Sequence, residues 1–180
     1  MGFKARFIAV VASAVVGMGL LWTFAFRDKL FGEDSSKRLL GTTLNFDTKL
    51  LNVAGEAVQL KEILSKSPKN IVALWATWCD PCIEELPLIQ KSLAAKKAEQ
   101  TQVVLINFDG GDPDRTIPEV KAWLISQRLS LETYFDVEGE LLDYFQTSMI
   151  PFAVGVGSSG KINWVNEGPF DWAAPKWKLE

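Results

Sequence analysis

The sequence feature that most limits the possible folds is a buried strand that runs directly into a pair of cysteines. Residues 70–77, NIVALWAT, form a nearly continuous apolar run rich in β-forming residues, which is typical of a strand covered on both faces of a sheet. Cys79 and Cys82 follow at once, and residues 82–99 then have helical spacing. The pattern predicts one strand that feeds one helix through a Cys-Asp-Pro-Cys turn.

The rest of the chain extends this unit into a single α/β domain. Thr116 and Glu119 match a capping box, so a helix is expected to begin there. Strands alternate with helices and end in a hairpin, which predicts a mixed sheet with helices on both faces. Residues 170–180 contain two Trp residues but have no clear period, and no element is expected there. The expected strands are two short runs within 43–60 around a Gly55 turn, then 102–108, 133–137, 151–156 and 161–168, and the expected helices are 61–67, 116–127 and 139–145.

The amino-terminal part of the chain contains an apolar segment. Between Arg6 and Arg27 lie twenty residues without a charge, and as a helix rising about 1.5 Å per residue they would cover roughly the 30 Å of a bilayer core. We expect residues 1–27 to be an uncleaved membrane anchor, residues 28–38 a polar tether, and residues 39–180 the folded domain. A cleaved signal peptide is the alternative, since a basic stretch precedes the apolar run, but no small-residue cleavage site follows it. The flanking basic residues do not decide the orientation.

Charge and residue types exclude several classes of function. Three of the 19 basic residues and none of the 22 acidic residues precede residue 28, so the remainder carries a net charge of −6 and is not expected to bind nucleic acid. The chain has two cysteines and no histidine, which is too few ligands for a structural zinc site within one chain. A haem-attachment site would need histidine where Ile83 stands. We expect neither a metal nor a cofactor at the cysteine pair.

The spacing of the cysteines points to redox chemistry. Because Cys79 and Cys82 are three residues apart at a helix start, both sulfur atoms lie on one face and within disulfide reach. The helix dipole and unpaired N–H groups favour the thiolate of Cys79, which makes it the expected exposed nucleophile. Cys82, one turn inside the helix, is expected to be more covered and to resolve the mixed disulfide. Pro81 is tolerated in the first turn, whereas Pro87 is expected to bend the helix.

Four short motifs follow one another along the chain: WATWCDPC, then EELP, then SMIP about 70 residues later, and a GSSGKI turn. Together they resemble the membrane-anchored thioredoxin-like oxidoreductases of the TlpA, ResA and CcmG group. The similarity covers roughly residues 39–168. It implies a thioredoxin-like fold with a central mixed sheet flanked by helices. It also implies that the domain faces the periplasm or its equivalent, tethered to the cytoplasmic membrane by an amino-terminal transmembrane helix. Disulfide-containing extracytoplasmic proteins, for example apocytochrome c or an oxidase assembly factor, would be substrates, and a membrane-embedded thiol carrier would be the electron donor.

The resemblance also implies roles for residues around the cysteines. Trp78, Ile150 and Pro151 are expected to contact the substrate, with a cis Ile150–Pro151 bond that faces the sulfur atoms and leaves the Ile150 backbone free to pair with an extended substrate. For an arbitrary X-Pro pair a trans bond is far more common, and it is the alternative. Asp80 and Pro81 are the expected redox-tuning residues. The negative charge of Asp80 opposes thiolate formation and favours a reducing dithiol, unless water screens it.

Three positions bear on how protons move and how partners bind. The internal aspartate that thioredoxin has six residues before its first active-site cysteine is replaced by Ala73. Glu85, three residues after Cys82, matches a glutamate of ResA-like proteins, and we expect it to be a partly desolvated acid–base group with a raised pKa. The alternative is a solvated surface acid. Phe152 stands where the family often has Thr, and its ring either narrows the partner groove or fills the core.

Two other functions are compatible with the sequence. A redox-inert binding module on the same fold would keep the cysteines as core thiols. A peroxiredoxin-type peroxidase is disfavoured because Thr77 stands two residues before Cys79 and so does not reproduce the Thr-x-x-Cys pattern of that family. The sequence favours a membrane-tethered thiol–disulfide oxidoreductase that reduces protein disulfides.

Overall fold

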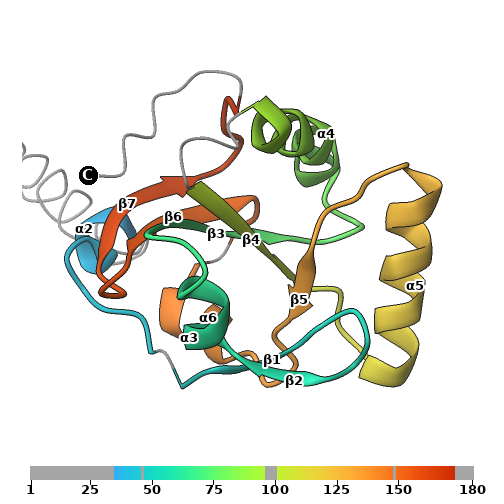
Figure 1. The fold of residues 1–180 in the computed structure, drawn as a ribbon, viewed down its shortest axis with the longest axis horizontal. Coiled ribbons are helices and arrows are strands. Elements are labelled where there is room, and N and C mark those ends of the chain that lie inside the picture. The colour runs from blue at the N-terminus through green and yellow to red at the C-terminus, as the bar shows by residue number, and fades with distance from the viewer. Residues whose placement is uncertain (1–34, 46, 96–100, 148, 173–180) are drawn as a thin grey trace, which may run out of the picture.

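A seven-stranded sheet forms the centre of the domain (Figure 1). The computed structural model describes residues 35–45, 47–95, 101–147 and 149–172. The helices are α2 (Ser35–Leu39), α3 (Leu60–Leu64), α4 (Asp80–Ala95), α5 (Pro113–Ser126) and α6 (Glu140–Phe145). The strands are β1 (Lys49–Leu51), β2 (Ala57–Gln59), β3 (Lys69–Trp75), β4 (Thr101–Asn107), β5 (Thr133–Phe135), β6 (Phe152–Gly157) and β7 (Ile162–Glu167).

The strand order is β2-β1-β5-β4-β3-β6-β7, and the sheet is mixed. Strands β3, β4 and β5 are parallel neighbours, while β6 pairs antiparallel with β3 and with β7. At the other edge, β1 pairs antiparallel with both β2 and β5. The prediction of a mixed sheet is therefore confirmed. Because β3, β4 and β5 run the same way, the loops that follow all three leave the same edge of the sheet, and the cysteine turn is one of them.

Helices cover both faces of the sheet, as predicted (Figure 1). The alternation of side chains in β3 explains how: Ala73 and Trp75 belong to the core beneath α4 and α5, whereas Val72 and Leu74 belong to the core beneath α3 and α6. Since both faces are covered, β3 has only one exposed residue, Lys69, at its start. This double burial accounts for the continuous apolar run that the sequence shows there.

Helix α5 begins three residues before the predicted position. Its N-cap is Asp112, whose side chain accepts a hydrogen bond from the backbone N–H of Asp114 at 3.1 Å, and Pro113 occupies the first helical position. The expected capping box at Thr116 and Glu119 is therefore wrong, and both residues lie inside the helix. Proline fits the first turn because its missing N–H would have no intrahelical partner there.

Helix α2 was not predicted, since its sequence has no apolar period. It is held by tertiary contacts: Leu39 is buried, and the Arg38 guanidinium donates to the backbone carbonyls of Tyr144 and Phe145 at the end of α6. Those carbonyls lack intrahelical partners at a helix end, so a cation there is favourable. The described end of the predicted tether is thus helical and packed on the domain.

Within the part of the chain that the structure describes, no helix has the length and apolar character needed to cross a membrane. The predicted anchor at residues 1–27 and the first part of the tether lie outside the described residues.

Candidate active site

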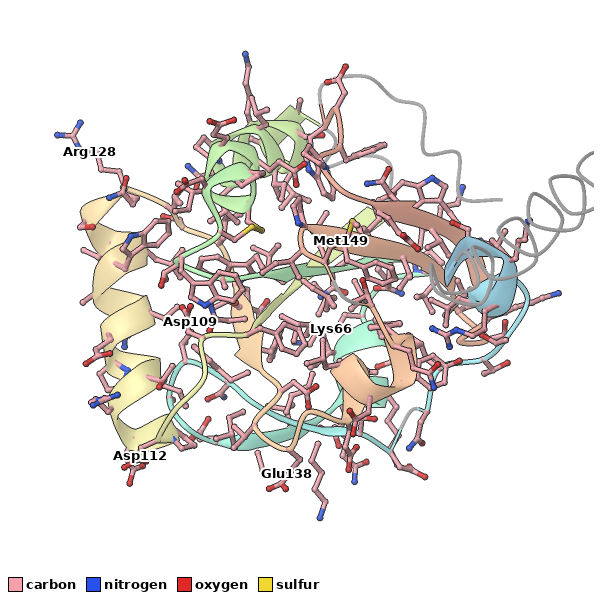
Figure 2. All side chains as sticks on the ribbon, turned by 180° about the vertical axis from the view of Figure 1, so that it is seen from behind. Lys66, Asp109, Asp112, Arg128, Glu138 and Met149 are labelled. Atoms are coloured by element: carbon pink, nitrogen blue, oxygen red, sulfur yellow. A yellow bond between two sulfur atoms is a disulfide. The ribbon has the colours of Figure 1, made fainter. Side chains whose placement is uncertain are left out.

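Cys79 and Cys82 form a disulfide at the start of α4, with a Cα–Cα distance of 5.2 Å. In Figure 2 it is the yellow bond where the ribbon of α4 begins, between the labelled Asp109 and Met149 in this view. The backbone N–H of Ile83 donates to the Cys79 carbonyl at 3.0 Å, which makes Cys79 the residue that precedes the helix. The N–H of Cys82 donates to the Cys79 sulfur at 3.3 Å, much as it would to the side chain of a conventional N-cap. The same donor would stabilise a Cys79 thiolate after reduction.

Both cysteines are buried in this disulfide form. Cys79 is 5% exposed and Cys82 is 2% exposed, and both belong to the apolar core between α4 and the sheet. The expected order of burial is confirmed, but the prediction of an exposed Cys79 is wrong for the oxidised state. The physical reason is that the bond holds the Cys79 sulfur against Cys82, which faces the core.

A small cavity lies behind Cys82. Its volume of about 10 Å³ is close to the roughly 10–15 Å³ that one water molecule requires. Cys82, Glu85 and Ala73 are among the residues that line it. Glu85 is therefore beside the resolving cysteine, and the methyl group of Ala73 faces the cavity where an internal aspartate is missing. Pro151, Phe170 and Trp172 also line this cavity.

The Glu85 side chain is buried, with 7% of the residue exposed. Burial raises the pKa of its carboxyl group, and hydrogen bonding from the Phe170 backbone N–H and from the Trp172 indole partly opposes that rise. The Phe170 N–H donates directly to Oε1 of Glu85. The Trp172 indole N–H lies close enough to act on the carboxyl group but does not meet the geometry of a full hydrogen bond. The expectation of a desolvated carboxyl with a raised pKa is confirmed, and the surface-acid alternative is wrong. Its acid–base role stays a prediction.

The Ile150–Pro151 peptide bond is cis, as predicted. Pro151 is buried and borders the same cavity as Cys82, while Ile150 is half-buried and packs against the cores of both sheet faces. Phe152 fills the core: it is 1% exposed and its ring centroid lies 5.2 Å from that of Phe145. It therefore does not narrow a partner groove.

The other predicted site residues lie on the surface around Cys79. Trp78 is 66% exposed and directly precedes the cysteine. Asp80 and Pro81 are exposed in the first turn of α4. Pro87 lies inside that helix, and the bend expected there stays a prediction.

A polar contact that the sequence reasoning missed holds the turn before Cys79. The Asp109 carboxylate accepts the backbone N–H of Thr77 through its two oxygens at 2.9 and 3.2 Å. The Asn107 amide donates to the same carboxylate at 3.1 Å and accepts from the Asp109 backbone N–H at 3.0 Å. The only signal was the position of the two residues, at and just after the end of a buried strand. Phe170 and Trp172 were also missed, because residues 170–180 lack a period.

Comparisons with known proteins agree with this geometry. The sequence model of the AhpC/TSA family matches residues 42–165. The chain is 25% identical over 117 residues to sporulation thiol-disulfide oxidoreductase A of Bacillus subtilis, covering 65% of this chain and 68% of that protein. It is 24% identical over 168 residues to the thiol-disulfide oxidoreductase ResA of Oceanobacillus iheyensis, covering 92% of this chain and 80% of ResA.

Solved structures show the same fold. The crystal structure of StoA from Bacillus subtilis matches with a TM-score of 0.57 and 22% identity, over 75% of this chain and 94% of StoA. A thioredoxin-family thiol:disulfide interchange protein from Chlorobium tepidum matches with a TM-score of 0.57 and 22% identity, over 76% of this chain and 90% of that chain. The predicted thioredoxin-like fold is confirmed. With a disulfide between Cys79 and Cys82 at the start of α4 and a family match over most of its length, the chain belongs to the AhpC/TSA family and is a thioredoxin-like thiol–disulfide oxidoreductase.

Proposed function

We propose that this oxidoreductase is tethered to the cytoplasmic membrane and reduces disulfides in proteins on its outer side. Apocytochrome c or an oxidase assembly factor would be typical substrates, and a membrane-embedded thiol carrier would return the enzyme to its reduced form. The uncharged segment of twenty residues before Arg27 supports the tether. The negative charge of Asp80 beside the sulfur atoms, which opposes thiolate formation, supports the direction of electron flow. The observation that carries the chemistry is the cavity that Glu85 shares with Cys82.

In the proposed reaction the dithiol form of the enzyme gives two electrons to a substrate disulfide. The Cys79 thiolate attacks one substrate sulfur, a mixed disulfide forms, and the other substrate sulfur leaves as a thiolate that takes a proton from water. Cys82 then loses its proton to the Glu85 carboxylate and attacks the Cys79 sulfur. The Cys79–Cys82 disulfide forms, and the second substrate thiolate leaves and is protonated in turn.

Glu85 has a specific task in this scheme. A thiol buried among apolar groups resists ionisation, and Cys82 is 2% exposed. The chain has no histidine, and Ala73 cannot accept a proton. Among the described residues that line the cavity, Glu85 has the only carboxyl group. Its raised pKa brings it closer to the working pH, where a group can both accept and return a proton.

Substrate contacts are assigned to the surface around Cys79. We assign this role to Trp78, which is 66% exposed and directly precedes Cys79, and to the half-buried Ile150 and its neighbour Pro151, which lines the cavity with Cys82. Because Cys79 is nearly covered in the oxidised form, we place the productive encounter with the reduced enzyme, whose sulfur atoms are no longer bonded to each other.

The test is a comparison of Glu85→Gln with Glu84→Gln in the reduced protein. Glu84 is the exposed neighbour on the same helix and is the matched control. General acid–base catalysis contributes on the order of 100-fold or more, so Glu85→Gln is expected to slow reduction of a protein disulfide by about that factor near pH 7. Glu84→Gln is expected to act as the parent does. Equal rates for Glu85→Gln and the parent from pH 6 to 9 would show that Cys82 loses its proton to water.

The same protein sample separates the two alternative functions. A redox-inert binding module would turn over no protein disulfide when a chemical reductant is supplied. A peroxidase would consume hydrogen peroxide faster than it reduces protein disulfides.

A separate experiment tests the membrane tether. The full chain is expected to stay in the membrane fraction after an alkaline wash, and its folded domain is expected to be digested when protease is added to the outer side of the membrane. Release by the wash, or protection from the protease, would contradict the proposed location.

A further inference from the structure

The segment after β7 contacts both Pro151 and Glu85 of the candidate active site. Residues 168–172, called the aromatic strap below, leave the sheet at Gly168 and contain Phe170 and Trp172. The backbone N–H of Gly168 donates to the carbonyl of Pro151 at 2.9 Å, which joins the strap to the loop beside the disulfide. Two residues later, the backbone N–H of Phe170 donates to the Glu85 carboxylate.

The strap is held in place by its own packing. The ring of Phe170 lies between those of Trp164 and Trp172, with centroid distances of 5.1 and 5.2 Å. Both pairs are edge-to-face, an arrangement that stabilises aromatic contacts beyond simple burial. The Asn166 amide donates to the Gly168 carbonyl at 2.7 Å, and the N–H of Trp172 donates to the Phe170 carbonyl at 3.1 Å. The backbone donor that reaches Glu85 is therefore fixed on both sides.

Trp172 carries the second contact. Its side chain is almost fully buried, at 2% exposed, and it lines the cavity with Cys82 and Glu85. Its indole N–H is one of the few buried side-chain polar atoms without a hydrogen-bond partner among the described residues. A buried donor without a partner is costly unless a nearby acceptor satisfies it. That donor is available to Glu85, or to a water molecule held between them.

We propose that the aromatic strap is a positioning element of the reaction, which fixes the Glu85 carboxyl group in the cavity beside Cys82 through the Phe170 N–H and the Trp172 indole. The inference rests on the proposed role of Glu85 as the proton acceptor of Cys82. Trp172 is a positioning residue, because it acts on the reaction through Glu85. The strap also connects Glu85 to Pro151, so the proton acceptor and the substrate-side loop share one support.

The groups that face Glu85 allow the direction of the effect to be assigned. Besides Glu85 itself, the described residues that line the cavity carry no charged side chain, and Cys82 is held in the disulfide and does not titrate in this form. The nearby acids Glu84 on α4 and Asp171 on the strap are exposed. Both donors of the strap favour the ionised carboxylate and lower its pKa against the opposing effect of burial. Removing the indole N–H must therefore raise the pKa of Glu85.

The test uses Trp172→Phe, which removes the indole N–H and keeps an aromatic ring. Trp164→Phe is the matched control, because Trp164 contacts Phe170 but does not line the cavity. The carboxyl resonance of Glu85, followed by carbon-13 NMR in the oxidised protein, is expected to titrate at higher pH in Trp172→Phe and unchanged in Trp164→Phe. Reduction of a protein disulfide by the reduced protein is expected to fall about tenfold at pH 6 in Trp172→Phe, less than the loss of a whole general base, and to recover by pH 9.

Three results would overturn the inference. The first is an unchanged Glu85 titration in folded Trp172→Phe, and the second is an equal shift in both Trp variants, which would mean that packing alone matters. The third comes from the parent and needs no Trp variant: the indole N–H resonance of Trp172 must shift with the titration of Glu85, and must not shift in Glu85→Gln. An indole resonance that ignores Glu85 refutes the coupling even if Trp172→Phe does not fold. If Glu85→Gln reduces substrate normally while the NMR coupling is present, the proposed role of Glu85 fails and the contact of the strap stands.

Discussion

Removing the Asp109 side chain is expected to destabilise the domain, because this carboxylate secures the turn that leads to Cys79. In Asp109→Ala, the backbone N–H of Thr77 and the amide of Asn107 both lose their acceptor. Asn107 is 2% exposed, so water does not readily replace the lost contact there, whereas Thr77 is half-buried. A hydrogen bond to a charged group is worth about 1.5–3 kcal/mol. Allowing for partial replacement by water at Thr77, the expected loss is about 2–4 kcal/mol in the free energy of unfolding.

The assay is urea or thermal unfolding of the oxidised protein at pH 7. At roughly 4 °C for each kcal/mol, the melting temperature of Asp109→Ala is expected to fall by about 8–16 °C. Asp109→Asn keeps one acceptor oxygen without its charge and is expected to lose about half as much. Asp114→Asn, at an exposed carboxylate early in α5, is the control and should change stability by less than about 1 kcal/mol. If Asp109→Ala unfolds at the same urea concentration and with the same slope as the parent, the contact with Thr77 does not support the turn.

Three further predictions concern the cysteine pair and Glu85. In the reduced protein, Cys79 is expected to react with an alkylating reagent at least about tenfold faster than Cys82, because the Cys82 N–H and the helix start favour the thiolate of Cys79. Equal rates for the two cysteines by mass spectrometry at pH 7 would contradict the assignment of Cys79 as the nucleophile. Asp80→Asn is expected to raise the reduction potential of the Cys79–Cys82 couple, by about 30 mV for each 1.4 kcal/mol of change in the free-energy difference between the dithiol and disulfide forms. A lower potential in that variant would show that Asp80 does not make the dithiol more reducing. Because burial raises the pKa of Glu85, the folded state binds the proton of this carboxyl group more tightly than the unfolded chain does. The parent therefore loses stability as the pH rises from 4.5, the ordinary pKa of a glutamate, through the pKa of Glu85 in the folded state. The melting temperature of Glu85→Gln relative to the parent should therefore increase from pH 4 to pH 8, and a constant difference would contradict the burial of the charge.

The elements around the active site could be predicted because their signals are local. Strand β3 is covered on both faces, so its residues form a continuous apolar run, and the two cysteines mark the start of the helix that follows. The burial of Glu85 could be inferred from its position one turn beyond Cys82. The start of α5 was ambiguous because Asp112 and Thr116 are both good N-cap residues. Pro113 decides between them, since it is best tolerated at the first helical position.

The contacts that complete the site could not be predicted, because they join distant residues through the backbone. Phe170 donates its N–H to Glu85 across 85 residues of sequence, and Asp109 accepts from the N–H of Thr77 across 32. A backbone donor has no side-chain signature, so neither pattern nor composition identifies it. Helix α2 is likewise stabilised by packing and by Arg38 at the end of α6, and a five-residue polar segment shows no sign of such contacts.

The most direct test of the account is the reduction potential of the Cys79–Cys82 couple, measured against a thiol–disulfide buffer and combined with turnover of a protein disulfide. A reductant of extracytoplasmic disulfides is expected to have a potential below about −200 mV and to reduce its substrate repeatedly when electrons are supplied. A potential near −120 mV, typical of a strong disulfide-forming oxidant, or a couple that turns over no protein disulfide, would contradict the proposed reaction.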